Sequence, residues 1–290
     1  MPVANITEVS NSAIVGNLLS AIGSPALVKG QVGMNLMYTE DLPVGTNVKK
    51  FVKYGALTGA IVAESTANAV DANGELTDSS ITSTAAKCIV VSGLSVEAEK
   101  FSNIDLARIA KEQFSAIARY VDTDFLSMAS GLATSVTAAT VLTVDDVMQG
   151  QFNIYNSNCP NQEVPLAVVI GPRAGYNLKK DIVQSGGSAW SNPAMLSVFN
   201  NTPVQPNGRL GSIPGVGDIY QTTGFATGGG DDTQMIIHPM WCLAGMFANS
   251  PETWIRQKGG EGFFTEVASF YFYDIIEWND LCGCALKSDT

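Results

Sequence analysis

The sequence contains few residues whose types and spacing could form a catalytic or metal site. His238 is the only histidine, so a metal site built from several histidines is excluded, and one histidine alone could activate a nucleophile. It lies in the stretch MIIHPMW, where a histidine that ends a strand-like run before a proline is more typical of a structural residue. Neither a G-x-S-x-G nucleophile elbow nor a G-x-x-x-x-G-K-S/T phosphate loop occurs. We therefore predict no catalytic residue and no bound metal.

Two glycine-containing stretches are weak candidates for ligand binding. GPRAG, residues 171–175, follows a strand-like run and opens a predicted helix, which is the setting of a phosphate site. It has only two glycines, however, and Pro172 lacks an amide N–H. GGGDD, residues 228–232, offers too few oxygen donors for a calcium cage, which needs six to eight ligands, and predicts a hairpin turn instead. We expect no cofactor at either place.

Cysteine usage gives little support to a disulfide or a zinc site. The five cysteines are scattered and odd in number, at Cys88, Cys159, Cys242, Cys282 and Cys284. Only Cys282 and Cys284 are close, as C-x-C rather than C-x-x-C, and no second pair accompanies them. The pattern predicts free thiols.

Composition leaves two interpretations of the surface open. Of the 290 residues, 46% are hydrophobic and 15% are charged, whereas about 25% are charged in ordinary soluble domains. Either the surface is rich in Ser, Thr and Asn, or much of it is buried against other subunits, because interface cores are depleted in charge.

The net charge of −11 argues against tight, direct binding of nucleic acid, because Lys and Arg supply that affinity by neutralising phosphates. A chain that merely surrounds nucleic acid is compatible with this charge. No apolar run approaches the roughly 20 residues of a membrane span, and the first residues, MPVANITEVS, lack the basic-then-apolar pattern of a secretory signal. We expect a soluble protein made in the cytoplasm, without a membrane partner.

One long amphipathic helix is predicted over residues 102–131. Its apolar residues recur every three or four positions, at Leu106, Ile109, Ala110, Phe114, Ile117, Val121, Phe125 and Met128. Ser102 or Asn103 is expected to cap its start, and Gly131 to end it in a left-handed conformation. At 1.5 Å per residue the helix forms a rod of roughly 40 Å, which is long for a chain without a catalytic signature.

The segments before this helix are expected to need another surface to pack on. Residues 1–45 are interpreted as an arm, since Gly and Pro interrupt the apolar stretch before a long helix can form. Residues 46–92 predict an extended hairpin with the β-prone limbs TNVKKFVKY and TSTAAKCIVV and a tight turn at Asn73–Gly74. A two-stranded hairpin of this kind is marginal alone.

The second half of the chain begins with a predicted helix and a buried strand. Thr143 and Asp146 fit a capping box. The apolar stripe of the helix is predicted at Val144, Val147, Met148 and Phe152. The run VPLAVVIG, residues 164–171, suits a strand buried on both faces. Pro172 suits the first turn of a following helix, so this part predicts an α/β block.

The remainder is predicted to be a long loop followed by strands. Residues 184–217 are loop-like, with one short helix candidate at NPAMLSVFN. The stretches DIYQTTGF, TQMIIHPMWCLAGMF and EVASFYFYDIIEW are β-prone.

The order of these parts resembles the major capsid proteins of tailed bacteriophages, which have the Hong Kong 97-type shell fold. Residues 87–131, KCIVVSGLSVEAEKFSNIDLARIAKEQFSAIARYVDTDFLSMASG, resemble the family's strand ending in V-S-x-x and its long helix closing near D-x-x-x-L-x-x-x-x-G. Upstream, GTNVKKFVKYGALTGAIVAEST resembles the outgoing hairpin strand. Downstream, TVDDVMQ and LAVVIGPRAGYNLKKD resemble a helix, strand and helix, and GSIPGVGDIYQTTGF resembles the stretch that returns to the long sheet.

The resemblance implies an α+β fold in five parts. Residues 1–45 would form the N-terminal arm, 46–92 the E-loop hairpin, and 93–133 the spine helix of the P-domain. Residues 134–251 would form the α/β A-domain, and 252–290 the strands that complete the P- and A-domains.

The resemblance also implies a structural protein, without enzymatic activity, that self-assembles into pentamers and hexamers of an icosahedral shell around double-stranded DNA. Expected partners are other copies of the chain, a separate scaffolding protein and a portal, with decoration proteins as further candidates. The expected location is the virion capsid, after assembly in the host bacterial cytoplasm. Two alternatives stay open: an encapsulin-type nanocompartment, and an uncharacterised soluble enzyme with His238 or the 184–217 loop at its site.

Five basic residues are candidates for contacts between subunits. Three of the sixteen basic residues concentrate on the hairpin, at Lys49, Lys50 and Lys53. They mark either a solvated strand or a strand docked against an acidic neighbour. The other two candidates, Arg108 and Arg119, lie on the long helix. Its polar residues are expected to face the interior of the shell or a neighbouring subunit: Arg108, Lys111, Glu112, Arg119 and Asp122.

Overall fold

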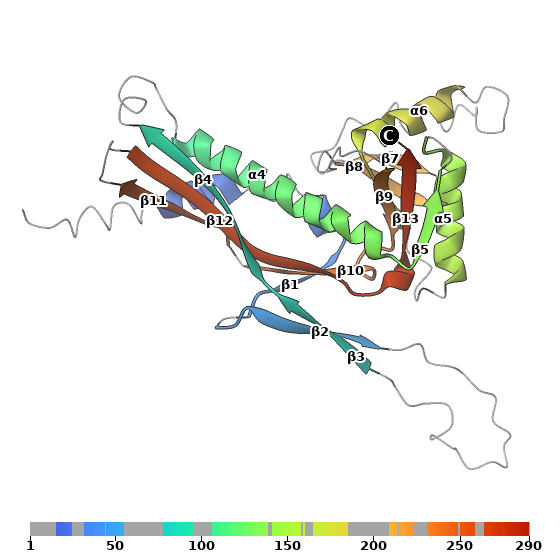
Figure 1. The fold of residues 1–290 in the computed structure, drawn as a ribbon, viewed down its shortest axis with the longest axis horizontal. Coiled ribbons are helices and arrows are strands. Elements are labelled where there is room, and N and C mark those ends of the chain that lie inside the picture. The colour runs from blue at the N-terminus through green and yellow to red at the C-terminus, as the bar shows by residue number, and fades with distance from the viewer. Residues whose placement is uncertain are drawn as a thin grey trace, which may run out of the picture.

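The computed structural model shows two β-sheets, a two-stranded hairpin, and a long helix that leads from one sheet to the other (Figure 1). It describes residues 16–24, 32–43, 45–54, 78–95, 106–138, 141–157, 159, 165–184, 209–213, 215–222, 231–248, 250–258 and 264–289. This is a mixed α+β fold, as the sequence predicts.

The first sheet is built around one long strand, β12 (Phe264–Glu277). On one edge of β12, β4 (Ala86–Ser95) pairs antiparallel along ten residues. On the other edge, β11 (Glu252–Lys258) and then β10 (Leu243–Phe247) pair antiparallel with successive parts of the strand. The short strand β1 (Tyr38–Asp41) extends the sheet beyond β10 in parallel. We call this the long sheet.

Helix α4 (Leu106–Ser127) lies along one face of the long sheet and ends in the 3₁₀ turn η2 (Met128–Gly131) (Figure 1). The predicted helix is therefore present, and the apolar side chains of its middle are buried at Ala110, Phe114, Ile117, Val121 and Phe125. The candidate caps Ser102 and Asn103 lie outside the described residues. Gln113 is also buried, because its amide Nε2 donates to Ser92 Oγ and to the Val267 carbonyl, both at 2.9 Å.

The predicted role of Gly131 is wrong. Its backbone is not in the left-handed region, which among the described glycines is occupied by Gly45, Gly215 and Gly217. Gly131 instead makes room for a side chain, because a Cβ atom there would collide with the carboxyl group of Glu277. The helix stops where the chain must pass close to the end of β12.

The second sheet has six strands in the order β5-β13-β9-β6-β8-β7. Its strands are β5 (Thr134–Thr137), β6 (Leu166–Ile170), β7 (Arg209–Ile213), β8 (Gly217–Gln221), β9 (Asp231–Ile237) and β13 (Gly283–Asp289). All five residues of β6 are buried, which confirms the strand predicted within 164–171. The helix α6 (Pro172–Gln184) begins at Pro172, as predicted.

Helix α5 (Val144–Asn156) packs on the six-stranded sheet with a face that matches the predicted one only in part. The capping box is confirmed, since Thr143 and Asp146 exchange side-chain and backbone hydrogen bonds. Met148 and Phe152, however, are exposed, at 38% and 61%. The predicted Val144 and Val147 are buried, and the buried face continues through Gly150 and Ile154, because the bare Gly150 backbone approaches Ile236 and Leu286 closely.

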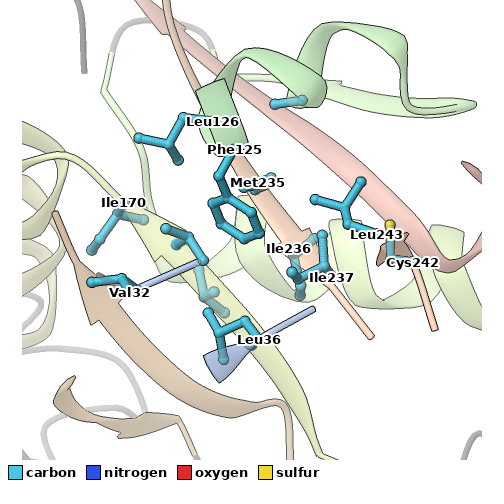
Figure 2. Close-up of a cluster of buried hydrophobic side chains, with 14 of the residues drawn as sticks. Val32, Leu36, Phe125, Leu126, Ile170, Met235, Ile236, Ile237, Cys242 and Leu243 are labelled. Atoms are coloured by element: carbon cyan, nitrogen blue, oxygen red, sulfur yellow. The ribbon is translucent and has the colours of Figure 1, made fainter. Parts of the chain in front are cut away.

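One continuous apolar core connects the two sheets (Figure 2). Phe125 and Leu126 from α4 meet Ile170 from β6 and residues of β9 there. The segment 32–37 also enters this core, since Val32, Leu36 and Met37 are 5% exposed or less. The described portion of the predicted arm, 1–45, therefore finds part of its packing surface on its own subunit.

Gly217, at the start of β8, is expected to tolerate no side chain. Its φ is +150°, which L-residues rarely adopt, and a Cβ atom would collide with the Leu166 backbone of the paired strand β6. Gly217→Ala should lower the free energy of unfolding by about 3 kcal/mol, from strain and overpacking together. Gly215→Ala is the control, because φ is +83° there but nothing lies within 4 Å of a Cβ atom. We expect it to lose about 1 kcal/mol; equal shifts in urea unfolding would contradict the collision.

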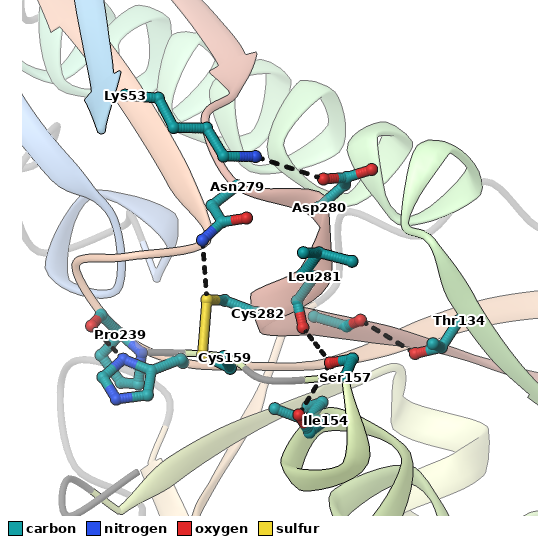
Figure 3. The surroundings of a disulfide bond; sticks show 12 residues. Lys53, Thr134, Ile154, Ser157, Cys159, Pro239, Asn279, Asp280, Leu281 and Cys282 are labelled. Atoms are coloured by element: carbon teal, nitrogen blue, oxygen red, sulfur yellow. Dashed lines mark hydrogen bonds and ion pairs between the residues drawn. A yellow bond between two sulfur atoms is a disulfide. The ribbon is translucent and has the colours of Figure 1, made fainter. Parts of the chain in front are cut away.

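The prediction of free thiols throughout is wrong. Cys159, just after α5, forms a disulfide with Cys282, in the turn η3 (Asp280–Cys282) between β12 and β13 (Figure 3). Their Cα atoms are 5.0 Å apart, within the usual range for disulfides. Cys88, Cys242 and Cys284 are free.

Candidate assembly surfaces

The hairpin is the most prominent projection from the body of the subunit (Figure 1). Its strands β2 (Val48–Tyr54) and β3 (Asp78–Thr84) pair antiparallel, from Val48 opposite Thr84 to Tyr54 opposite Asp78. Among the described strands they pair only with each other. After Ala85 the chain continues as β4 of the long sheet. The limb between 55 and 77, with the predicted turn at Asn73–Gly74, lies outside the described residues. Since an isolated two-stranded hairpin is only marginally stable, other contacts must hold the hairpin where it joins the body of the subunit.

A small apolar cluster anchors the base of the hairpin. Phe51, from the middle of β2, is 3% exposed and packs with Ala85, Ala244 and Met246. Trp278 lies beside this cluster, and its indole Nε1–H donates to the Val52 carbonyl at 3.1 Å. The cluster is separate from the main core. The hairpin is thus attached to β10 of the long sheet through a cluster that lies apart from the main core.

Polar contacts with Asp274 of β12 hold the returning strand. Ser83 Oγ donates to Asp274 Oδ2 at 2.7 Å, and the Thr84 amide N–H donates to the same oxygen at 2.8 Å. Both bonds lie where β3 leaves the hairpin and β4 enters the long sheet. Together with the apolar cluster around Phe51, these bonds fix the direction in which the hairpin projects.

The three hairpin lysines fall into two groups. Lys49 forms an ion pair with Glu40 of β1, and Lys53 Nζ lies 3.6 Å from Asp280 Oδ1 of η3. The hydrogen bond from Lys49 holds the pKa of the Glu40 carboxyl below its usual value. Lys50 is exposed and forms no ion pair with the part of the chain that the structure describes. The acidic neighbours of Lys49 and Lys53 therefore lie within the subunit, and a contact of Lys50 with another copy stays a prediction.

Asp122 ties the N-terminal segment to the body. The sequence places it on the polar face of the helix, but this is wrong, because the residue is only 2% exposed. Its carboxylate accepts the amide N–H of Val32, at 3.0 and 3.1 Å, and that of Gly33, at 3.1 Å. Thr222 Oγ1, at the end of β8, donates to it at 3.3 Å. Burial raises the pKa of this carboxyl group, and the hydrogen bonds oppose the shift.

The face of the long sheet opposite α4 exposes apolar side chains. Ile89 and Val91 of β4 are each 49% exposed, and Trp254 of β11 is 60% exposed. They share one face, since both Val91 and Trp254 pair with Ala268 of β12. Lys87 Nζ lies 3.9 Å from the ring centre of Phe270 on this face, a cation–π contact. Contiguous exposed apolar groups are typical of interaction sites.

Arg108 and Arg119 are exposed on α4. Neither forms an ion pair within the described part of the subunit. Their predicted role between subunits stays a prediction.

The candidate enzymatic residues do not assemble into a site among the described residues. His238 is 1% exposed; its Nδ1 lies 2.9 Å from the Pro239 carbonyl oxygen, and its ring contacts Trp241 edge-to-face. The described residues hold no group of three or more His, Cys, Asp or Glu placed to bind a metal. Most of the segment 184–217 lies outside the described residues, and the prediction of a loop is wrong for Arg209–Ile213, which form β7. No described helix combines the length and the hydropathy needed to cross a membrane.

Comparison with solved structures identifies the fold. No family model and no curated protein sequence matches the chain. The capsid of a native GTA particle is similar with a TM-score of 0.66 and 8% identity, over 90% of this chain and 91% of that one. The capsid of Ralstonia phage GP4 is similar with a TM-score of 0.63 and 10% identity, over 88% and 87%. A virus-like particle from Pyrococcus furiosus has a TM-score of 0.58 and 8% identity, over 94% and 99%. The predicted resemblance to tailed-phage capsid proteins is confirmed at the level of the fold.

Proposed function

We propose that this chain is the major capsid protein of a tailed bacteriophage, which assembles as pentamers and hexamers into an icosahedral shell around double-stranded DNA. The observation that carries the proposal is the shared fold over about nine-tenths of the chain. The proposal implies a portal and a separate scaffolding protein as partners in the host cytoplasm, with decoration proteins as further candidates.

The exposed parts of the subunit support association with further copies. The hairpin projects beyond the body and leaves the edges of its two strands unpaired among the described residues. The apolar face of the long sheet, with Ile89, Val91 and Trp254, offers a surface for a neighbour. Burying apolar area contributes about 25 cal/mol per Å² before entropic costs. Apolar contacts repeated at every subunit can therefore hold a shell together without covalent bonds between subunits.

The net negative charge of the chain is compatible with a shell that surrounds DNA without binding it tightly. With 27 acidic and 16 basic residues, the subunit lacks the cationic excess that gives tight binding to phosphates. A shell built from this subunit would retain DNA because the shell is closed, and tight binding of the phosphates would not be needed.

A shell around protein cargo, of the encapsulin type, is the second candidate. The similarity to the Pyrococcus furiosus virus-like particle, which is covered over 99% of its length, supports it. Native particles distinguish the two: nuclease-protected DNA inside them favours the phage capsid, and a packaged protein favours the compartment.

Electron microscopy of the purified protein tests both shell functions. We expect closed or aberrant shells under assembly conditions. A strictly monomeric sample free of particles would overturn both the phage capsid and the compartment and would favour a soluble enzyme.

Lys50→Glu is expected to reduce the yield of particles while leaving the subunit folded. Lys50 forms no ion pair with the described residues, so reversing its charge breaks no described ion pair within the subunit. In a shell, a like-charge contact costs about 1 kcal/mol or more at each of many interfaces, so the yield should fall at least about tenfold. Particles are counted after sedimentation, and folding is checked by circular dichroism.

Lys180→Glu is the matched control, since it makes the same charge change at an exposed position of α6. The triple change of Lys49, Lys50 and Lys53 to Glu should impair assembly further, because it also breaks the ion pairs at the hairpin base. Normal yields from Lys50→Glu would remove this residue from the interface.

A further inference from the structure

The disulfide lies at the corner where the chain passes from one sheet to the other (Figure 3). Strand β12 of the long sheet ends at Glu277, η3 follows, and β13 of the six-stranded sheet begins at Gly283. Cys282, in η3, is 0% exposed, and Cys159, after α5, is 3% exposed. The bond therefore ties the end of α5 to the connection between the sheets and closes a separation of 123 residues.

The same corner is also held without the disulfide. Ser157 Oγ donates to the Leu281 carbonyl at 2.7 Å, and the His238 amide N–H donates to the Cys282 carbonyl at 2.9 Å. Asn279 Nδ2 lies 3.1 Å from Cys282 Sγ. These contacts would bring both sulfur atoms into place in the dithiol form. The subunit can thus fold before the bond exists.

Two free thiols near the corner are poor nucleophiles. Cys242 and Cys284 are both fully buried, and Cys242 Sγ would lie only 2.7 Å from a Cβ atom on Gly283. Burial raises the pKa of both thiols. Since the thiolate is the attacking form, neither is suited to open the bond. Once formed, the disulfide should last until an external reductant reaches it.

We propose that the Cys159–Cys282 disulfide forms late, by oxidation after the subunit has folded and associated, and we call this disulfide the clasp. The subunit folds and associates as the dithiol, and later oxidation fixes the six-stranded sheet against the long sheet. The timing rests on the proposed function, because a bacterial cytoplasm keeps thiols reduced. The oxidant is a small-molecule disulfide such as oxidised glutathione. Because Cys159 and Cys282 are buried in the closed fold, the exchange takes place when the corner opens locally. One cysteine thiolate then attacks the oxidised glutathione and releases one glutathione; the second attacks the mixed disulfide and releases the other. Two protein thiols are oxidised and one glutathione disulfide is reduced to two thiols.

The order of events is tested by trapping thiols at lysis. Cells are opened directly into N-ethylmaleimide, and the peptide joining Cys159 to Cys282 is quantified by mass spectrometry without reduction. We expect little linked peptide at lysis and nearly complete linkage after the purified protein meets oxidised glutathione. Full linkage at lysis would overturn late closure, and no linkage after oxidation would overturn the clasp.

The stabilising effect is tested by heating oxidised protein with and without a phosphine reductant. Closing a separation of this length should raise the unfolding midpoint by about 5 °C or more, and the reductant should abolish the gain. Cys159→Ser and Cys282→Ser should be insensitive to the reductant, whereas Cys88→Ser, which removes a free thiol, should respond like the unchanged protein. An equal reductant effect on Cys159→Ser would overturn the clasp.

Both measurements are made on the isolated subunit as well as on particles. Reductant-sensitive subunits that never form shells would overturn the proposed function and leave the clasp in place. Shells that form normally but never contain the linked peptide would overturn the clasp alone.

Discussion

Asp122→Ala is expected to lower the free energy of unfolding by about 4 kcal/mol. The change removes the acceptor for the buried amide N–H groups of Val32 and Gly33 and for the Thr222 hydroxyl group. Each buried donor left without a partner costs about 1–3 kcal/mol. The three donors come from the N-terminal segment and from the end of β8, so both should loosen together.

The loss should be visible in two measurements. Urea unfolding gives the change in stability, and hydrogen exchange reports on the segment 32–37, which should lose protection more than the middle of β12. Asp122→Asn separates charge from hydrogen bonding, because its amide oxygen can still accept both N–H groups and its NH₂ can donate to Thr222. We expect it to lose about 1 kcal/mol or less. If Asp122→Asn lost as much unfolding free energy as Asp122→Ala, the effect would be due to the charge of Asp122 and not to its hydrogen bonds.

Glu112→Ala is the matched control for Asp122→Ala. It removes a carboxylate from an exposed position of the same helix, and surface changes of this kind stay within about 0.5 kcal/mol. If Asp122→Ala were equally mild, the hydrogen bonds to the N-terminal segment would contribute little to stability.

The pH dependence of Asp122 follows from its burial. Because burial raises the pKa of this carboxyl group above its usual value, the folded state binds the proton more tightly than the unfolded state. Between the unfolded pKa, about 3.9, and the higher folded pKa, stability therefore increases as the pH falls. Asp122→Asn has no such proton. The difference in unfolding free energy between the unchanged protein and Asp122→Asn should shift toward the unchanged protein as the pH falls from 7 to 4, and a constant difference would contradict the raised pKa.

Periodicity made the main elements predictable. The long helix is predictable because residues such as Phe114, Ile117 and Val121 repeat at helical spacing, and β6 is predictable because five apolar residues run together between turn signals. The outgoing strand of the hairpin is predictable from the β-prone residues of β2, but the prediction of the return strand is wrong in part. Most of the predicted limb TSTAAKCIVV is β4, which pairs with β12 of the long sheet, and β3 begins in the polar stretch before that limb. Where the prediction is right, the pattern is local, and burial of one face is enough to select it.

Contacts between remote residues were not predictable in the same way. Asp122 and Gln113 have polar side chains that become buried only because partners from other elements satisfy them. Cys159 and Cys282 are 123 residues apart, and no spacing rule pairs two cysteines across such a distance. The partners of Lys49 and Lys53 come from β1 and η3. The sequence suggested acidic neighbours for these lysines but carried no signal that they lie in the same subunit.

Phe51→Ala is expected to abolish assembly while the subunit remains folded. Phe51 is the side chain that the hairpin strand β2 contributes to the small cluster with Ala85, Ala244 and Met246, and that cluster is separate from the main core. Truncating a buried phenylalanine costs about 3–5 kcal/mol. Because the cluster joins the hairpin to the long sheet and lies apart from the main core, this loss falls mainly on the attachment of the hairpin, where polar contacts such as those to Asp274 remain. The hairpin would lose its fixed direction, and neighbouring subunits could no longer meet it in register.

The measurement combines particle counts with a local probe of the hairpin. We expect no closed shells by electron microscopy, near-normal unfolding of the two sheets in urea, and fast hydrogen exchange confined to residues 48–54 and 78–84. Val52→Ala is the matched control, since Val52 neighbours Phe51 on β2 but is 39% exposed; it should leave exchange at the hairpin base unchanged. Normal shells from Phe51→Ala would show that the direction of the hairpin is set by the neighbouring subunit and not by its own base. Lost shells with unchanged exchange at the hairpin would place the defect elsewhere in the subunit, and the anchoring role of Phe51 would fall.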